Sequence, residues 1–300
     1  MNEAVQETSA PQKFTEMSNA QRFWRRFIKN RAGVVGTTIF LTVILVAISA
    51  PALAPNDPGQ QNIVYRLMPP FWQDGGSMDF PLGTDQVGRC VLSRLIWGAR
   101  ISLFVGVSAV ALGAVVGTSL GLISGFVGGR TDSVIMTLVD TMLTFPALIL
   151  AMAFAAVLGP GMGNIIIVLA LVDWSRYARL VRGDTMVIKE REFVLAANAM
   201  GRTGPGIMWG HVLPNVMQSI IVVSTLRLAA VILMEASLSF LGLGTAGRIP
   251  SWGLMIAHGR EVITLAWWLP TLPGLAILVT IISVNLFGDS VRDVFDPRVN

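Results

Sequence analysis

Charged residues interrupt several stretches that are otherwise apolar enough to cross a bilayer, and these residues could do chemistry there. They are Asp140, Asp173, Arg227 and Glu235. A charge inside a membrane is costly, so such residues usually face the protein interior or a water-filled path and pair with one another. We predict an ion pair between Asp140 and Arg227. The four residues could recognise a charged group of a substrate on a path through the membrane, or could form structural ion pairs at a subunit contact. Phe145 is added to this candidate path because Pro146 is expected to bend the helix beside it.

The sequence lacks the common catalytic and metal-binding patterns. Cys90 is the one cysteine, so a disulfide within the chain and a CxxC metal site are excluded. The two histidines, His211 and His258, fall in loops on opposite sides of the predicted spans and do not suggest a metal site. Neither a GxxxxGK[ST] phosphate loop nor an HExxH pair occurs. We therefore expect no enzyme activity and no cofactor or metal bound by this chain, and any ATP must be hydrolysed by another chain.

The composition indicates a membrane as the solvent. Hydrophobic residues make up 53% of the chain and charged residues 13%, whereas soluble domains carry roughly 25% charged residues. The net charge of +4 could suggest nucleic acid, but the basic residues lie between apolar stretches rather than in one patch, so we expect no nucleic-acid partner.

Six apolar stretches approach the length of about 20 residues that a helix needs to cross a bilayer. They cover residues 33–54, 101–126, 133–158, 164–177, 216–243 and 269–287. The fourth is short and contains Asp173. Gly106, Gly113, Gly117 and Gly121 recur at helical spacing in the second stretch and could form a seam for close helix packing. Trp252, Trp267 and Trp268 are expected at the membrane interface. The fold class is therefore an all-α membrane protein with six transmembrane helices.

Lysine and arginine indicate the orientation of these spans. They are concentrated before the first span and between spans 4 and 5, which predicts that both termini lie in the cytoplasm. We expect a disordered tail at 1–20, an interfacial amphipathic helix at 21–32, the first span and a periplasmic loop at 33–100, and a five-helix core at 101–300. A secretory signal is the alternative for the first span, but its apolar stretch is longer than the usual ~7–15 residues.

The longest polar loop within the core, 178–215, could dock on a partner protein. Residues 192–200 favour a short helix with Leu195, Ala199 and Met200 on an apolar face, and Gly201 can end it in the left-handed conformation. Thr203, Gly204 and Pro205 indicate a turn, and a second short helix is expected to stop at Pro214. A slim helix of this kind suits insertion into a groove on a partner.

This loop resembles the "EAA loop" of ABC importer permeases, the coupling helix that docks on the ATP-hydrolysing subunit. The resemblance rests on two alanines, a glycine five residues after the first, and a later Leu-Pro pair. It implies ATPase coupling for Glu192, Ala196, Ala197, Gly201, His211, Leu213 and Pro214. Leu195 stands where the family has its glutamate, and Glu192 lies one turn earlier.

Three further stretches resemble the C-type permease of dipeptide and oligopeptide importers. They are PLGTDQVGR at 81–89 with GARISL at 98–103, ASLSFLGLG at 236–244 with PSWG at 250–253, and NLFGDSVRD at 285–293. Cys90 departs from the family, which usually has aspartate there. The resemblance implies a location in the bacterial inner membrane, the type I importer permease fold and alternating access. It also implies a homologous B-type permease partner, two ATP-binding subunits that use ATP and Mg, and a periplasmic peptide-binding protein.

Two other functions stay open at this point. An ion-coupled secondary transporter could use Asp140, Asp173 and Arg227 as a proton relay. That class is expected to carry an internal repeat, and we see none between the two halves of the sequence. A membrane-embedded enzyme would need a nucleophile and base or a metal cluster. For an importer, short peptides are the favoured substrate, with longer peptides, glutathione and metal chelates as alternatives.

Overall fold

The computed structural model describes residues 30–244 and 250–295, and these residues form helices and loops. The main helices are α2 (Arg31–Ile48), α4 (Val91–Val127), α5 (Gly129–Thr144), α6 (Ala147–Leu158), α7 (Met162–Ile188), α10 (Leu213–Phe240) and α12 (Trp268–Phe295). Shorter elements are α3 (Ala50–Leu53), η1 (Ile63–Tyr65), α8 (Glu192–Ala199), α9 (Gly204–Ile207), η2 (Met208–Val212) and α11 (Trp252–Arg260). The tail expected at 1–20 and most of the amphipathic helix expected at 21–32 lie outside the described residues.

Four helices of the described chain are long and apolar enough to cross a membrane, and a fifth span arises if the bent pair α5 and α6 is one span. The four are α2, α4, α10 with the segment that precedes it from Gly204, and α12. α4 begins at Val91, ten residues before the predicted start, and its first turn contains Arg94, which is buried inside the protein. An all-helical membrane fold is therefore observed, while the sixth span stays a prediction.

The expected bend lies at Phe145 and Pro146. α5 and α6 meet there at an angle of 98°. The ring of a proline disfavours helical geometry in the residue before it, and Phe145 accordingly has φ −83° and ψ 141°, an extended conformation. Two local residues thus divide what the sequence presents as one continuous apolar stretch.

A glycine seam joins α4 to α7, its most extensive helix contact. A Cβ on Gly117 would lie 2.3 Å from the Trp174 carbonyl oxygen, and one on Gly121 would lie 2.6 Å from that of Ala178. Gly113 faces the same helix with more room. Small residues let two backbones approach closely in a membrane, so the predicted seam is confirmed at these three positions. Gly106 instead packs against Ile232 and Leu228 of α10.

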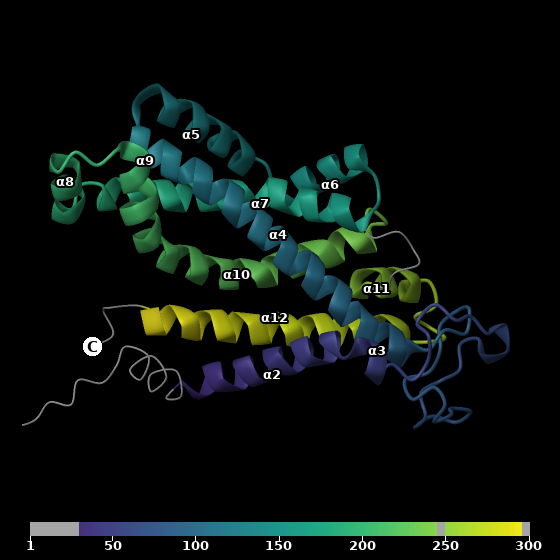
Figure 1. The fold of residues 1–300 in the computed structure, drawn as a ribbon. Coiled ribbons are helices and arrows are strands. Elements are labelled where there is room, and N and C mark those ends of the chain that lie inside the picture. The colour runs from purple at the N-terminus through teal and green to yellow at the C-terminus, as the bar shows by residue number, and fades with distance from the viewer. Residues whose placement is uncertain (1–29, 245–249, 296–300) are drawn as a thin grey trace, which may run out of the picture.

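The helices form one elongated bundle with loops at both ends (Figure 1). The start of α2, the end of α12 and the short helices α8 and α9 lie at one end, and the long loop between α3 and α4 lies at the other. α5 and α6 lie on one side of the bundle and α2 lies on the opposite side (Figure 1).

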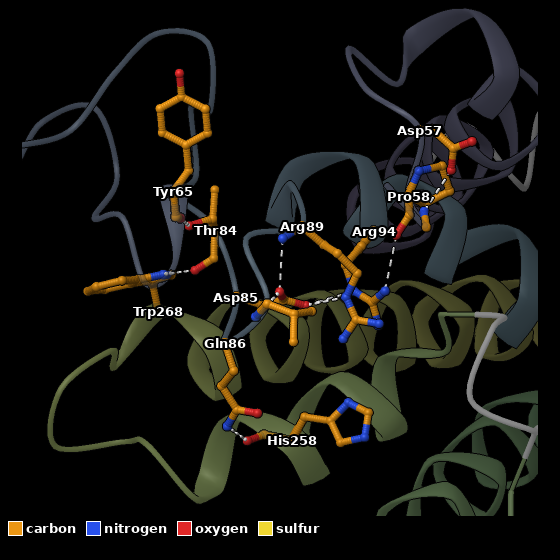
Figure 2. Close-up of polar contacts among 12 residues, drawn as sticks. Asp57, Pro58, Tyr65, Thr84, Asp85, Gln86, Arg89, Arg94, His258 and Trp268 are labelled. Atoms are coloured by element: carbon orange, nitrogen blue, oxygen red, sulfur yellow. Dashed lines mark hydrogen bonds and ion pairs between the residues drawn. The ribbon is translucent and has the colours of Figure 1, made fainter. Parts of the chain in front are cut away.

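The long loop is held on the bundle by a polar network around Asp85 (Figure 2). The Asp85 carboxylate accepts from the Arg89 side chain at 2.6 Å and lies 3.7 Å from the Arg94 Nε. Arg94 donates to the Pro58 carbonyl at 3.1 Å, and the Gln86 amide donates to the backbone carbonyl of His258 at 2.8 Å. Burial, together with the charges of Arg89 and Arg94, lowers the pKa of His258. The network fastens the loop to both α4 and α11.

Two of the three tryptophans expected at the interface are packing residues instead. Trp252 is 2% exposed, lies against Gly98 and donates to the Leu95 carbonyl at 2.9 Å. Trp268 is also buried and donates to the Thr84 carbonyl (Figure 2). Their indole N–H groups find protein acceptors, which is what buried tryptophans need. The interfacial prediction was therefore wrong for both, and of the three only Trp267 is exposed.

Cys90 is the residue that precedes α4. It is buried, and its side chain makes no capping hydrogen bond to the helix. Aspartate at such a position accepts from the first free N–H groups of a helix. The Cys90 side chain thus provides no helix cap, and the Asp85 network reaches the first turn of α4 through Arg94.

Candidate functional site

A polar stripe runs along the exposed face of α5 within the bent span. We define the path stripe as Ser133, Thr137, Asp140, Thr141 and Thr144, which are all exposed. The four hydroxyl groups donate to backbone carbonyls of their own helix, one turn earlier. Their oxygen lone pairs stay available to accept hydrogen bonds. Exposed hydroxyls and a carboxylate on a candidate span suit a water-filled path or a contact between subunits better than they suit lipid.

Asp140 pairs with Arg179 of α7 rather than with Arg227. Their side chains are 66% and 52% exposed, so the pair lies at the surface of the described chain. The predicted pairing was wrong because Asp140 points outward from α5, whereas Arg227 lies inside the bundle on α10. The Asp140 and Arg179 pair therefore adds opposite charges to the path stripe.

Asp173 forms the enclosed ion pair with Arg227. The carboxylate is 2% exposed and accepts from the Arg227 Nε at 2.9 and 3.2 Å, and also from its Nη2. Arg176 approaches the same carboxylate at 3.4 Å from one turn along α7. Two cations thus face one buried anion. The Arg176 side chain is 39% exposed, so part of this positive charge reaches the surface.

Glu235 lies apart from the path stripe. Its side chain is fully buried between α10 and α4, where Ser102 donates to it at 3.2 Å and Ser239 at 2.8 Å. The structure thus places Glu235 in a closed polar contact between two helices. Phe145, in contrast, is 53% exposed at the bend that ends α5, next to the path stripe. Contact of either residue with a substrate stays a prediction.

The segment 178–215 contains the predicted short helix, α8, and holds it on the bundle by two side chains. Val194 and Ala197 are buried in a hydrophobic cluster with residues of α7, residues of α10 and Leu122 near the end of α4. Gly201 ends the helix with φ +77°, as expected for a left-handed cap. His211 lies 2.7 Å from an Arg202 guanidinium nitrogen and contacts the Phe193 ring. α8 is therefore packed on the ends of the long helices.

The outer face of this segment exposes large apolar side chains. Phe193, Leu195, Met200 and Trp209 are 40%, 56%, 81% and 54% exposed. We call these four residues the apolar patch. Glu192 and Ala196 are exposed beside it. A group of exposed apolar residues with a polar surround is typical of a protein contact.

The second short helix does not stop at Pro214. α9 leads through η2, a π-helical turn, directly into α10, and Pro214 occupies the first turn of α10. Leu213 donates its N–H to the Met208 carbonyl, five residues earlier. Proline has no N–H to donate and is tolerated in the first turn of a helix. Pro214 therefore marks the change from the π-helical turn to the α-helix, and at Leu213 the chain continues without a break from the loop into α10.

Several polar residues of these sites have sequence signals that the prediction did not use. The hydroxyls of the path stripe recur at three- and four-residue spacing, which places them on one helix face. Asp173, Arg176 and Arg179 follow one another at three-residue spacing on α7. In the described residues, no group of three or more histidine, cysteine, aspartate or glutamate side chains lies together as a metal site would require.

Comparison with known families finds two matches that together cover most of the chain. Residues 117–300 match the binding-protein-dependent transport system inner membrane component. Residues 18–70 match the N-terminal transmembrane domain of oligopeptide transport permease C. The first match includes the path stripe and the segment 178–215, and the second includes α2.

Curated relatives are similar over nearly their whole length. The di/tripeptide transport system permease protein of Pseudomonas aeruginosa is 43% identical over 94% of this chain and 93% of its own. The dipeptide transport system permease protein of Haemophilus influenzae is 39% identical, with 97% and 99% covered. The glutathione transport system permease protein of Pectobacterium atrosepticum is 37% identical, with 93% and 91% covered.

Proposed function

The chain belongs to the family of binding-protein-dependent transport system inner membrane components, and we propose that it is the C-type pore subunit of an ATP-driven importer of short peptides. The observation that carries this proposal is the apolar patch, which lies exposed on a segment whose inner face is packed on α7 and α10. A docked partner that moves this patch would move two long helices with it. The relatives' peptide substrates supply the substrate class.

Six spans follow if α7 is the remaining one. α7 has 27 residues, long enough to cross a bilayer. It carries the charged residues Asp173, Arg176, Arg179, Arg182 and Asp184. Three of these charges are paired with residues outside α7, Asp173 with Arg227, Arg179 with Asp140 and Arg182 with Asp132. Pairing lowers the cost of charges inside a membrane, which supports α7 as the fourth of six spans.

The coupling helix is proposed to be α8, docked on an ATP-binding subunit through the apolar patch. Ala196 faces outward beside the patch, while Ala197 is buried and anchors the helix. Gly201 fixes the exit of the chain from α8, and His211 and Leu213 lead to Pro214 and α10. ATP and Mg are used by the partner subunits, and this chain supplies the surface on which their closure acts.

The translocation path is proposed to run along the path stripe, between this chain and a homologous B-type permease. Thr137, Thr141 and Thr144 can accept hydrogen bonds from peptide N–H groups. Arg179 and the exposed part of Arg176 can attract a peptide carboxylate, and Asp140 can attract its amino group. Opposite charges on one face suit a zwitterionic peptide, and the bend at Phe145 can change the shape of the path during alternating access.

The orientation proposed is that of an inner-membrane protein with both termini in the cytoplasm. Figure 1 supports this, since the start of α2 and the end of α12 lie at the same end as α8. An ATP-binding subunit at α8 would then share a side with the start of α2 and the end of α12. The long loop fastened by Asp85 would face the periplasmic peptide-binding protein.

Transport by the assembled complex tests the proposal. The chain, its B-type partner and the ATP-binding subunits are reconstituted in vesicles with a labelled dipeptide and the binding protein. We expect uptake that needs ATP and persists without an ion gradient. Uptake that needs a proton or sodium gradient and ignores ATP would overturn the proposal and favour the ion-coupled transporter.

A further inference from the structure

A groove of about 370 Å³ lies between α2 and α4, on the side of the bundle away from the path stripe. Its walls are apolar, with Phe40, Ile44 and Ile48 from α2 and Phe104 and Val107 from α4. Arg100 of α4 is the one charged residue among those that line it. The groove is open to the surface, where Phe104 and Ile48 are 55% and 68% exposed.

Arg100 lies at the end of this groove where the α2 span ends. Arg100 lines the groove together with Ile48, the last residue of α2. Phe40 and Val107, which also line it, lie about two turns further along α2 and α4. Phe40 is eight residues from Ile48, which is about 12 Å along a helix. The Arg100 guanidinium stacks on Trp97 at 5.4 Å. Tryptophan and arginine near helix ends are typical of the headgroup level of a membrane.

No carboxylate forms an ion pair with Arg100 in residues 30–244 and 250–295. Its positive charge is therefore not neutralised by the described chain. A cation at the headgroup end of an apolar channel is complementary to a molecule with a negative head and a hydrocarbon tail. An anionic phospholipid has this form, and in a bilayer it is present at high concentration.

The side chains around the groove favour lipid over a second protein subunit. The exposed residues of α2 include large aliphatic side chains, among them Val35, Leu45 and Ile48, at 54%, 63% and 68% exposed. Contacts between membrane helices favour small residues, which permit close approach, as in the α4 and α7 seam. The exposed charges of Asp140 and Arg179 lie on the other side of the bundle, so the subunit contact is expected there.

We propose that the α2–α4 groove binds an anionic phospholipid, with one acyl chain along Ile44, Phe104 and Val107 and the phosphate paired with Arg100. Phosphatidylglycerol suits the site because its head carries no ammonium group to compete with Arg100 for the phosphate. The lipid would fasten α2 to α4 on the face away from the path. This site does not depend on which substrate the complex carries.

Lipid binding is measured by native mass spectrometry of the purified full chain from nanodiscs that contain phosphatidylglycerol and phosphatidylcholine in equal amounts. One arginine near a membrane surface contributes about 1 kcal/mol of attraction to anionic lipid, which is about a fivefold preference. Arg100→Gln is expected to remove about this fivefold preference for phosphatidylglycerol. Val107→Trp, which fills the groove, is expected to reduce retention of both lipids.

Arg260→Gln is the matched control, because Arg260 is also exposed and stacks on an aromatic ring, Phe240 at 4.7 Å. It should leave the preference unchanged. An unchanged preference in Arg100→Gln, or an equal loss in Arg260→Gln, would overturn the proposal. Loss of the B-type subunit from the Arg100→Gln complex with lipid retention unchanged would also overturn it and assign the groove to a protein contact. Thermal melting of each variant checks that it is folded.

Discussion

Replacing Gly117 by alanine places a methyl group where α4 and α7 have no room for it. The added Cβ would lie 2.3 Å from the Trp174 carbonyl oxygen and 2.6 Å from the Tyr177 Cβ. Ordinary contact begins near 3.4 Å, so the helices must separate by about 1 Å at this point. The nearest atom belongs to the α7 backbone and cannot turn aside as the end of a flexible side chain would.

Gly113→Ala is the matched control, one turn away in the same seam. A Cβ at Gly113 would lie 3.5 Å from the Ala170 carbonyl oxygen, which is ordinary contact. Both variants gain about 0.5–1 kcal/mol because alanine is the better helix former. Only Gly117→Ala adds the cost of overpacking, about 1–3 kcal/mol. Gly117→Ala should therefore be less stable than Gly113→Ala by about 1–3 kcal/mol.

The assay is thermal unfolding of the purified full chain in detergent, followed by loss of the native size-exclusion peak. We expect the apparent midpoint of Gly117→Ala to lie at least about 2 °C below that of Gly113→Ala. Gly113→Ala should melt at or slightly above the original chain. If Gly117→Ala melted at or above Gly113→Ala, the close approach of α4 and α7 at this glycine would be refuted.

Three further predictions concern the loop, the buried charges and the long loop at the opposite end. Gly201→Val should lower the stimulation of the partner ATPase during peptide transport several-fold, because valine is strained at φ +77°. Gly201→Asn should retain this stimulation, and equal stimulation in the two variants would contradict the docking role. Asp173→Asn should cost up to about 3–5 kcal/mol of unfolding free energy, since it leaves Arg227 partly buried without a counter-charge. Asp140→Asn should cost less than about 1 kcal/mol of unfolding free energy because its ion pair is exposed. Similar shifts of the melting temperature in Asp173→Asn and Asp140→Asn would show that burial does not make the Asp173 pair more important for stability. The lowered pKa of His258 means that the folded state binds its proton less readily than the unfolded state. Stability from this residue is therefore full above the ordinary pKa of about 6.5 and falls as the pH drops below it. The protection factors of amides in residues 83–90, which are exchange rates corrected for the intrinsic pH dependence of exchange, should fall between pH 7.5 and 5.5. His258→Gln should remove that fall; a fall in protection that survives the substitution would rule out this assignment.

Local sequence signals predicted the elements of the fold well. Apolar length marked α2, α4, α10 and α12, because a helix in a bilayer must bury about 20 residues whatever its neighbours are. Pro146 marked the bend because its ring acts on the residue directly before it. Gly201 marked the end of α8 because the left-handed conformation favours glycine. Each of these effects acts over a few residues of one chain segment.

Contacts between distant segments were decided by the tertiary structure. The sequence placed Asp140 in the third span and Arg227 in the fifth, but it could not show that Asp140 turns outward to Arg179 while Arg227 turns inward to Asp173. It showed the glycines of α4 on one face, yet only packing revealed that Gly106 meets α10 and Gly117 meets α7. By itself the sequence determined a helical membrane chain, its family and its candidate residues. The partner of each charge depends on the rotation and register of whole helices, and these are set by side-chain packing along their full length.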